Sequence, residues 1–337
     1  MLHHHIDQTN EDFLLNLNIR NKSVEISKKL IVNTPSPNFY INLLKKNIPF
    51  AMNKRTHGFW DALVYIEYVT KDFEKIYSSI LNKNEILTLA CRWMREQPQW
   101  YQRFVYIFGE GFIRECFNDL NYPNNSKNLF QAISIVGTFG QKIPDSNKLH
   151  KEKMIEIICN LTKRFNKIYD ATIWKEAAYT GELLNLVKTI QDRPIIAIGP
   201  NHLKKLNERI ELKNFKFVEI PNHGGAIKKR LDVFQDLNNA IKEIISINKN
   251  SHPIIILQAG CIANWLIERL FNDHKNISYL DMGLVLDVWF PEIITTKSAS
   301  WGWFGQRRYL ILKKMKVEKL YRKILADKFY DYFPDLK

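Results

Sequence analysis

The chain has 337 residues, of which 45% are hydrophobic, so it is long enough for one large or two modest domains and too apolar for a disordered protein. Its formal net charge of +14 favours anionic partners, namely nucleotide phosphates, nucleic acid, acidic glycans or an anionic membrane surface. No apolar run approaches the roughly 20 residues that span a bilayer, and the first residues lack the pattern of a secretory signal, so we expect a cytoplasmic protein without a transmembrane segment.

The N-terminal part predicts a helical extension followed by the first strand. Residues 1–45 contain short amphipathic stretches, and Phe39–Lys46 has helical periodicity. Ile48–Asn53 predicts a strand, and Lys54–Leu63 predicts the end of that strand turning into a helix. The polar and small residues at this strand end are Arg55, His57 and Gly58.

The middle of the chain mixes aromatic and basic segments. An aromatic block from Trp93 to Phe112 predicts core or a strand face, and it contains Glu110. Gln131–Gly140 predicts a strand and a turn. Lys151–Tyr169 predicts a basic amphipathic helix.

The cysteine pattern argues against a metal or disulfide framework. The four cysteines, Cys91, Cys116, Cys159 and Cys261, lack the spacing of zinc ligands or paired half-cystines. Cys261 follows a strand-end glycine, so a nucleophile and a small buried thiol are both open interpretations.

The second half alternates short β-branched runs with helical periods. The expected strands are Pro194–Ile198, Phe215–Ile220, Pro253–Leu257 and Ile277–Leu280, with helices over 231–247 and 262–270. Such alternation predicts an α/β, Rossmann-like, mostly parallel sheet with helices on both faces. Ligands of open parallel sheets bind outside the carboxyl ends of the strands, so we expect the loops after these strands to form one site.

The C-terminal tail combines aromatic and basic residues. Trp301, Trp303 and Phe304 precede Arg307, and a Lys-rich helix is expected to reach Lys328. This tail either lies on an anionic membrane or packs back on the sheet with its lysines in water. The expected division is an N-terminal extension (1–45), a Rossmann-like domain (46–297) and an aromatic, basic helical tail (298–337).

Several phrases of the second half point to a family. They are Ile198-Gly199-Pro200-Asn201-His202-Leu203, Val218-Glu219-Ile220-Pro221, Gln258-Ala259-Gly260-Cys261-Ile262-Ala263-Asn264, and Leu280-Asp281-Met282-Gly283 with Asp287. Together, over about Asp170 to Glu292, they resemble the GT-D type of glycosyltransferase. The resemblance implies transfer of a sugar from a nucleotide-sugar donor to a glycan or other hydroxyl acceptor.

The chain departs from this family where the first strand ends. There the family has an Arg-x-x-Asp-Gly-Glu-like phrase whose carboxylates serve donor and metal binding, and the matching place here is Arg55-Thr56-His57-Gly58-Phe59-Trp60. Phe59 cannot ligate a hard divalent cation, and a lone His57 imidazole suits Mg or Mn poorly. We therefore expect no required metal cofactor, with Mn or Mg binding as the alternative.

Glycosyl transfer needs cations or helix ends for the departing diphosphate and a base for the acceptor hydroxyl. The expected donor-binding residues are Arg55, His57, Gly58, Gly199, Pro200, Asn201, His202, His223, Gln258 and Gly260. The first candidate for the base is Asp281, and the next candidates are Asp287 and Glu110.

The resulting hypothesis is a nucleotide-sugar-dependent glycosyltransferase. Two alternatives stay open: a catalytically inactive binding or assembly subunit of the same fold, and a protein that binds or modifies nucleic acid through its basic surface.

Overall fold

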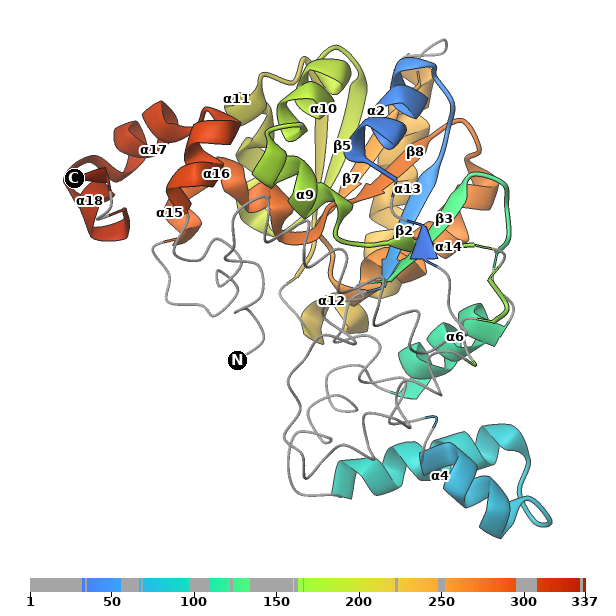
Figure 1. The fold of residues 1–337 in the computed structure, drawn as a ribbon. Coiled ribbons are helices and arrows are strands. Elements are labelled where there is room, and N and C mark those ends of the chain that lie inside the picture. The colour runs from blue at the N-terminus through green and yellow to red at the C-terminus, as the bar shows by residue number, and fades with distance from the viewer. Residues whose placement is uncertain are drawn as a thin grey trace.

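The protein is built around one parallel β-sheet with helices on both faces (Figure 1). The computed structural model describes residues 32–33, 35–55, 67, 69–96, 110–121, 124–133, 160, 163–165, 167–221, 224–247, 252–294, 308–333 and 336–337. The expected α/β, Rossmann-like class is confirmed by this architecture.

Every pairing between neighbouring strands of the sheet is parallel. The sheet has eight strands in the order β1-β4-β3-β2-β8-β7-β5-β6. The strands are β1 (Val32–Asn33), β2 (Ala51–Arg55), β3 (Leu129–Ile133), β4 (Ile168–Asp170), β5 (Pro194–Gly199), β6 (Asn214–Glu219), β7 (Ile254–Leu257) and β8 (Ser278–Asp281). The four strands expected in the second half are thus present, as β5 to β8.

The strand register aligns the ends of three central strands. Leu257 of β7 lies opposite Ile198 of β5 and opposite Asp281 of β8. The backbone N–H of Gln258 continues this ladder by donating to the carbonyl of Ile198 at 2.9 Å. The loops that follow these strands therefore start at the same level, along what we call the carboxyl edge.

Side chains alternate between the two faces of each strand, and this alternation divides the core into two layers. Ile196 and Ile198 pack into one layer, whereas Ile195 and Ala197 pack into the other. The first layer, the α14 face, carries α4 (Lys83–Glu96), α6 (Glu110–Asn121), α12 (Gly224–Lys228), α13 (Arg230–Ile247) and α14 (Cys261–Asp273).

The second layer is the α9 face. It carries α2 (Pro37–Lys45), α9 (Ile173–Thr180), α10 (Leu183–Ile190), η2 (Asn201–Lys205), α11 (Leu206–Ile210), η3 (Gly283–Trp289), α16 (Arg308–Met315), α17 (Glu318–Leu325) and α18 (Phe329–Tyr332). A short helix, α15 (Pro291–Ile294), connects η3 to the segments that follow. Two described elements lie in the extension expected to be helical. Strand β1 pairs with β4, and helix α2 buries Tyr40 against Phe50 and Phe130, so both belong to the domain and not to a separate extension.

Two secondary-structure predictions are wrong within the described residues. Ile168–Asp170 form a strand between β3 and β1, so the helix predicted over Lys151–Tyr169 does not reach its C-terminal residues. The predicted Lys-rich helix is broken into α16, α17 and α18, and the breaks occur where Lys316 and Ala326 have φ angles of 53° and 45°. Periodicity alone shows neither the pairing of a three-residue strand nor a left-handed residue.

The described part of the C-terminal tail packs into the α9 layer, against α9 and η3. Tyr321 is fully buried, and its hydroxyl donates a hydrogen bond to the carbonyl oxygen of Val288 in η3 at 2.8 Å. None of the helices that the structure describes combines the length and the apolar content needed to cross a bilayer.

Candidate functional site

The predicted site residues of the second half gather along the carboxyl edge, from three different loops. His202 lies in η2 after β5, Gln258 follows β7, and Asp287 lies in η3 after β8. Asp287 Oδ1 accepts hydrogen bonds from His202 Nε2 and from Gln258 Nε2, each at 2.8 Å. Residues separated by as many as 85 positions therefore form one polar cluster.

Burial distinguishes the members of this cluster. The Asp287 side chain is 4% exposed, whereas the His202 side chain is 22% exposed and packs edge-on against Phe290. A carboxylate only accepts hydrogen bonds, so Nε2 of His202 is the donor in this contact, and a neutral imidazole bound in this way carries its lone pair on Nδ1. A buried carboxylate that orients a partly exposed imidazole is an arrangement suited to proton transfer.

Glycines allow the close approach of backbone at this edge. A Cβ atom on Gly199 would lie 2.5 Å from Leu203 Cδ1 and 3.1 Å from the Gln258 carbonyl oxygen. Gly260, at the N-terminus of α14, has a φ of +55°, and a Cβ atom on it would meet nothing within 4 Å. Gly199 is thus required for packing, and Gly260 for backbone conformation. Pro200 and exposed Asn201 begin η2.

A second charged cluster lies at the same edge and was missed by sequence reasoning. Lys54, near the end of β2, is 7% exposed, and its Nζ lies 3.0 Å from the position of a Cβ added to Gly283. Lys175, in the first turn of α9, is close enough for the two ammonium groups to repel each other. The carboxylates that face these lysines belong to Asp170 and Asp281.

Burial changes the pKa values of the groups in this cluster so that their neutral forms are favoured. Desolvation, opposed by the attraction of Lys54, raises the pKa of Asp281 to about 7. Desolvation, with repulsion from Lys54, lowers the pKa of Lys175 to about 7. Desolvation also lowers the pKa of Lys54, against the attraction of Asp281 and Asp170. Asp170 accepts hydrogen bonds from the backbone N–H and the hydroxyl of Thr172, which fixes the chain just before α9.

One short element connects the two clusters. Gly283, against Lys54, begins η3, and Asp287, against His202, lies four residues later in the same 3₁₀ helix. At a rise of about 2 Å per residue, these positions are roughly 8 Å apart along the helix axis.

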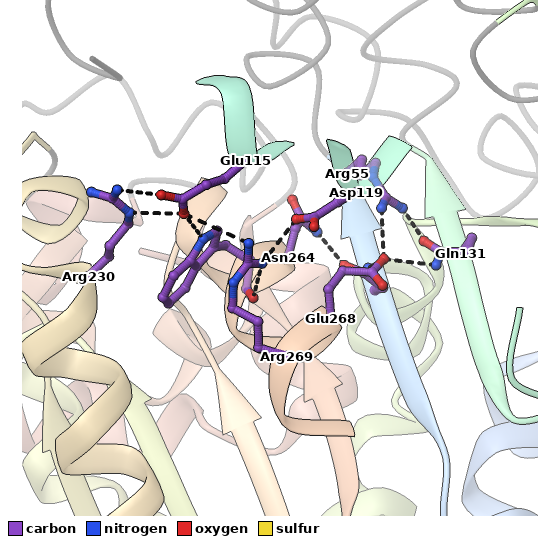
Figure 2. Close-up of polar contacts among 10 residues, drawn as sticks. Arg55, Glu115, Asp119, Gln131, Arg230, Asn264, Glu268 and Arg269 are labelled. Carbon is purple, nitrogen blue, oxygen red and sulfur yellow. Dashed lines mark hydrogen bonds and ion pairs between the residues drawn. The ribbon is translucent and has the colours of Figure 1, made fainter. Parts of the chain in front are cut away.

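Arg55 lies on the opposite face of the sheet, where its two terminal guanidinium nitrogens bind Gln131 and Glu268. Figure 2 shows its guanidinium beside Glu268 and Gln131, with an Arg55 Nη2 to Glu268 Oε1 distance of 2.9 Å. The Arg55 side chain is 1% exposed and the Glu268 side chain 6% exposed. This placement points the predicted donor cation into the α14 layer, away from η3.

The rest of the network in Figure 2 ties α6 to α14. Glu115 of α6 accepts hydrogen bonds from Arg230 and Trp265, and Asp119 pairs with Arg269 at 3.0 Å. The Arg269 guanidinium also stacks on the Trp265 ring at 4.2 Å. These contacts stabilise the helix layer on the α14 face and are distinct from the edge facing η3.

The remaining predicted residues contribute no described side chain to the edge. Glu110 is the first residue of α6, which belongs to the α14 face, and His57, Gly58 and His223 lie outside the described residues. Burial raises the pKa of Cys261 to about 12, which favours the buried-thiol interpretation. Within the described ranges, no three His, Cys, Asp or Glu side chains are grouped as ligands of one metal ion would be.

An open groove lies beside the C-terminal part of η2. It has a volume of about 770 Å³ and runs between η2, α11 and the edge strand β6. Its lining residues are Lys204, Lys205, Asn207, Glu208, Phe215, Phe217 and Glu219. Aromatic rings beside charged and amide groups are suited to a polar molecule with apolar faces, such as a sugar chain.

Comparison of the chain with protein-family models, with curated proteins and with solved structures found no match. The function must therefore be inferred from the residues themselves.

Proposed function

We propose that this chain is a glycosyltransferase that moves a sugar from a nucleotide-sugar donor to a hydroxyl acceptor at the carboxyl edge of its sheet. The observation that carries the proposal is the hydrogen-bonded cluster of His202, Gln258 and Asp287, three residues expected in such a site from three separate loops. The edge itself is where open parallel sheets bind nucleotides.

In this proposal His202 takes the proton of the acceptor hydroxyl. Asp287 holds the imidazole so that Nδ1 accepts the proton, and its buried carboxylate stabilises the imidazolium that forms. The Gln258 amide keeps Asp287 in place by donating to the same oxygen atom. The oxygen of the acceptor then bonds to the anomeric carbon, and the nucleoside diphosphate leaves with the electron pair of the broken bond.

The groove beside η2, the 3₁₀ helix that also carries His202, supports a glycan as the acceptor. Its volume of about 770 Å³ falls in the range of small-molecule sites, roughly 300–1,000 Å³. Phe215 and Phe217 lie on the same side of β6, where their rings are partly exposed to a sugar face. The amide and charged groups that line the same groove are available to sugar hydroxyls.

The decisive experiment is titration of the purified protein with a panel of nucleotide-sugars, with and without Mn²⁺. We expect binding of at least one donor and release of its nucleoside diphosphate when a suitable acceptor is added. Lys188→Met, which changes an exposed residue of α10, serves as the matched control. If no member of the panel binds in either condition, the donor assignment is wrong. Binding without transfer or hydrolysis supports the inactive-subunit alternative.

A second candidate function, binding of nucleic acid, is favoured by the described tail. Its exposed lysines are Lys313, Lys314, Lys316, Lys319, Lys323, Lys328 and Lys337. Contacts of such lysines with phosphates release counterions, so binding falls steeply with salt. Replacing Lys313 and Lys314 by Gln should lower the salt slope of DNA or RNA binding by about 1 to 2, whereas an unchanged slope excludes this tail as the contact surface.

A further inference from the structure

We propose that the acceptor is a linear chain of neutral sugars, and that the groove beside η2 holds this chain along the edge strand β6. This inference rests on the proposed function and adds the length, the charge and the orientation of the acceptor. The reaction is then the lengthening of an existing glycan. The hydroxyl at the end of the chain gives its proton to His202 and bonds to the anomeric carbon of the donor, whose nucleoside diphosphate leaves with the electron pair of the broken bond.

The groove follows β6 away from the carboxyl edge. Glu219, at one end of the lining, is paired in register with Gly199, the last residue of β5. Phe215, at the other end, is paired with Ile195. Four residue steps at about 3.3 Å each make this part of the strand roughly 13 Å long, which exceeds the width of one pyranose ring. The groove is therefore long enough for a chain of sugars.

The helix η2 relates the groove to His202. Side chains three residues apart in a 3₁₀ helix eclipse each other, so Lys205, which lines the groove, projects on the same side of η2 as His202. His202 lies in the first turn of η2, which starts directly after β5 ends at the carboxyl edge. The end of a bound chain that lies at this edge is therefore the end nearest to His202, and the other sugars lie along β6.

Two aromatic rings line the groove one after the other. Phe215 and Phe217 are partly exposed and pack on the core of the α9 face, whereas Val218 belongs to the core of the α14 face. Residues two apart on a strand project to the same side, and here they are separated by roughly 7 Å. The apolar face of a sugar can pack on an aromatic ring. Successive sugars of one chain can therefore pack on Phe217, nearer to the edge, and on Phe215.

The charges of the lining balance each other. Lys204, Lys205, Glu208 and Glu219 are all exposed, and together they give the groove two positive and two negative groups. A polyanion gains little attraction from such a surface, although the whole chain has a net charge of +14. Neutral sugar hydroxyls, by contrast, can donate hydrogen bonds to the glutamates and accept them from the lysines. The balance of charge therefore favours a neutral glycan over an acidic one.

An extended peptide is the other linear ligand that an edge strand can bind. Such a peptide adds to the strand in the plane of the sheet, through backbone hydrogen bonds. The groove lies instead over the α9 face, between β6, η2 and α11. Its position favours a ligand that packs on the rings of Phe215 and Phe217 over one that extends the sheet.

The first test measures binding of neutral oligosaccharides to the full chain, without any nucleotide, by isothermal titration calorimetry. The probes are cello-, malto-, manno- and chito-oligosaccharides of increasing length, from the single sugar to the hexasaccharide. In a series that binds, affinity should rise with each added sugar until the groove is full. Phe215→Leu and Phe217→Leu should each weaken binding of the hexasaccharide about 3- to 10-fold. Phe217→Tyr keeps the ring and should bind like the parent chain, as should the matched control Phe39→Leu, which changes an exposed ring of α2.

The second test measures orientation in the transfer reaction, with the same oligosaccharides as acceptors. Because the growing end lies at His202, Phe217→Leu should raise KM even for short acceptors. Phe215→Leu should raise KM only for longer acceptors, which reach further along β6. The opposite order, or the same length dependence for both variants, would overturn the orientation.

Several binding results would overturn the groove as a glycan site. They are absence of binding by all four series, affinity that does not depend on length, or affinities of both Leu variants equal to that of Phe39→Leu. Binding of a Lys-flanked octapeptide of alternating Thr and Val, with no binding of any oligosaccharide, would assign the groove to strand addition instead. If melting curves show that the Leu variants do not fold, Lys205→Met and Glu219→Gln replace them, since both side chains are exposed, and should weaken binding likewise.

The outcomes also separate this inference from the proposed function. Glycan binding without any sugar transfer would support the groove and count against the transferase alone. Transfer to a single sugar as fast as to the hexasaccharide would overturn the groove alone.

Discussion

Lys54 and Arg55 are consecutive residues of β2 whose side chains lie on opposite faces of the sheet. Arg55 enters the α14 layer and pairs with Glu268 at 2.9 Å, whereas Lys54 lies against Gly283 beneath η3. A single step along the strand thus separates a cation of the α14 layer from one that lies at the carboxyl edge. The two should respond to substitution in different ways.

Arg55→Met should destabilise the protein without affecting the edge at η3 directly. Removal of one partner leaves Glu268 buried without its counter-ion, which costs about 3 kcal/mol or more. The double variant Arg55→Met/Glu268→Met should lose less stability than the sum of the two single variants. Urea unfolding measures these free energies, and additive losses would mean that the pair is not coupled.

Replacing His202 by Gly should lower the rate of sugar transfer by about 10² to 10⁴, the usual range for loss of a general base. Added imidazole should restore part of the rate to this variant, because it supplies the missing base in the vacated space. Asp287→Asn keeps the shape of the carboxylate and should lower kcat with little change in KM. A rate for His202→Gly close to that of Lys188→Met would contradict the assignment.

Substitution of Gly199 and substitution of Gly260 should lower the stability of the protein for different reasons. Gly199→Ala introduces contacts with Leu203 and the Gln258 backbone and should cost about 1 to 3 kcal/mol of stability while displacing the Gln258 amide. Gly260→Ala meets no neighbour and should lose about 1 to 3 kcal/mol from backbone strain. Gly111→Ala, with only an ordinary 3.6 Å contact to Arg230, is the control. Equal stability of all three in thermal unfolding would contradict the packing argument.

Asp281 and His252 should give opposite pH dependences of stability. Burial raises the pKa of Asp281 to about 7, above its unfolded value, so its contribution is present below about pH 4 and is lost as pH rises to 7. Desolvation, with Arg193 nearby, lowers the pKa of His252 to about 4, so its contribution is present above pH 6.5 and is lost as pH falls to 4.

Denaturant unfolding between pH 4 and 7 separates these effects. Asp281→Asn should remove the loss of stability with rising pH, and His252→Asn should remove the loss with falling pH. If stability depends on pH in the same way in the parent chain and in both variants, then neither Asp281 nor His252 has the shifted pKa that this prediction assumes. His252 contacts Ser278 Oγ at 2.9 Å and lies far from the loops after the strands, so its substitution should leave ligand binding intact.

The sequence predicted the strands and helices of the second half well because each has one clear periodicity. β5, β7, α13 and α14 all begin within two residues of their expected bounds. The gathering of the loops at the carboxyl edge was also predictable, since the carboxyl ends of parallel strands lie at the same edge of a sheet. What periodicity could not show is a three-residue strand such as β4, which exists only through pairing with its neighbours.

The candidate site was predictable in part. His202, Gln258 and Asp287 were expected, but a hydrogen bond between them requires the strand register, which no local pattern contains. Lys54 was overlooked beside Arg55, although the alternation of Ala51–Arg55 would have assigned the two to different faces. Lys175 carries no sequence signal, because its proximity to Lys54 depends on how α9 packs.

The hydrogen bond from Tyr321 to Val288 gives the C-terminal helices a part in assembling the site. Both candidate clusters contact η3, and η3 is held from behind by a residue that the ribosome adds 33 positions after Val288. Nascent chains that stop before Tyr321 should therefore contain every strand of the described sheet and still lack a firmly seated η3. During translation, the ability to bind a ligand should therefore appear only after all strands of the described sheet have formed.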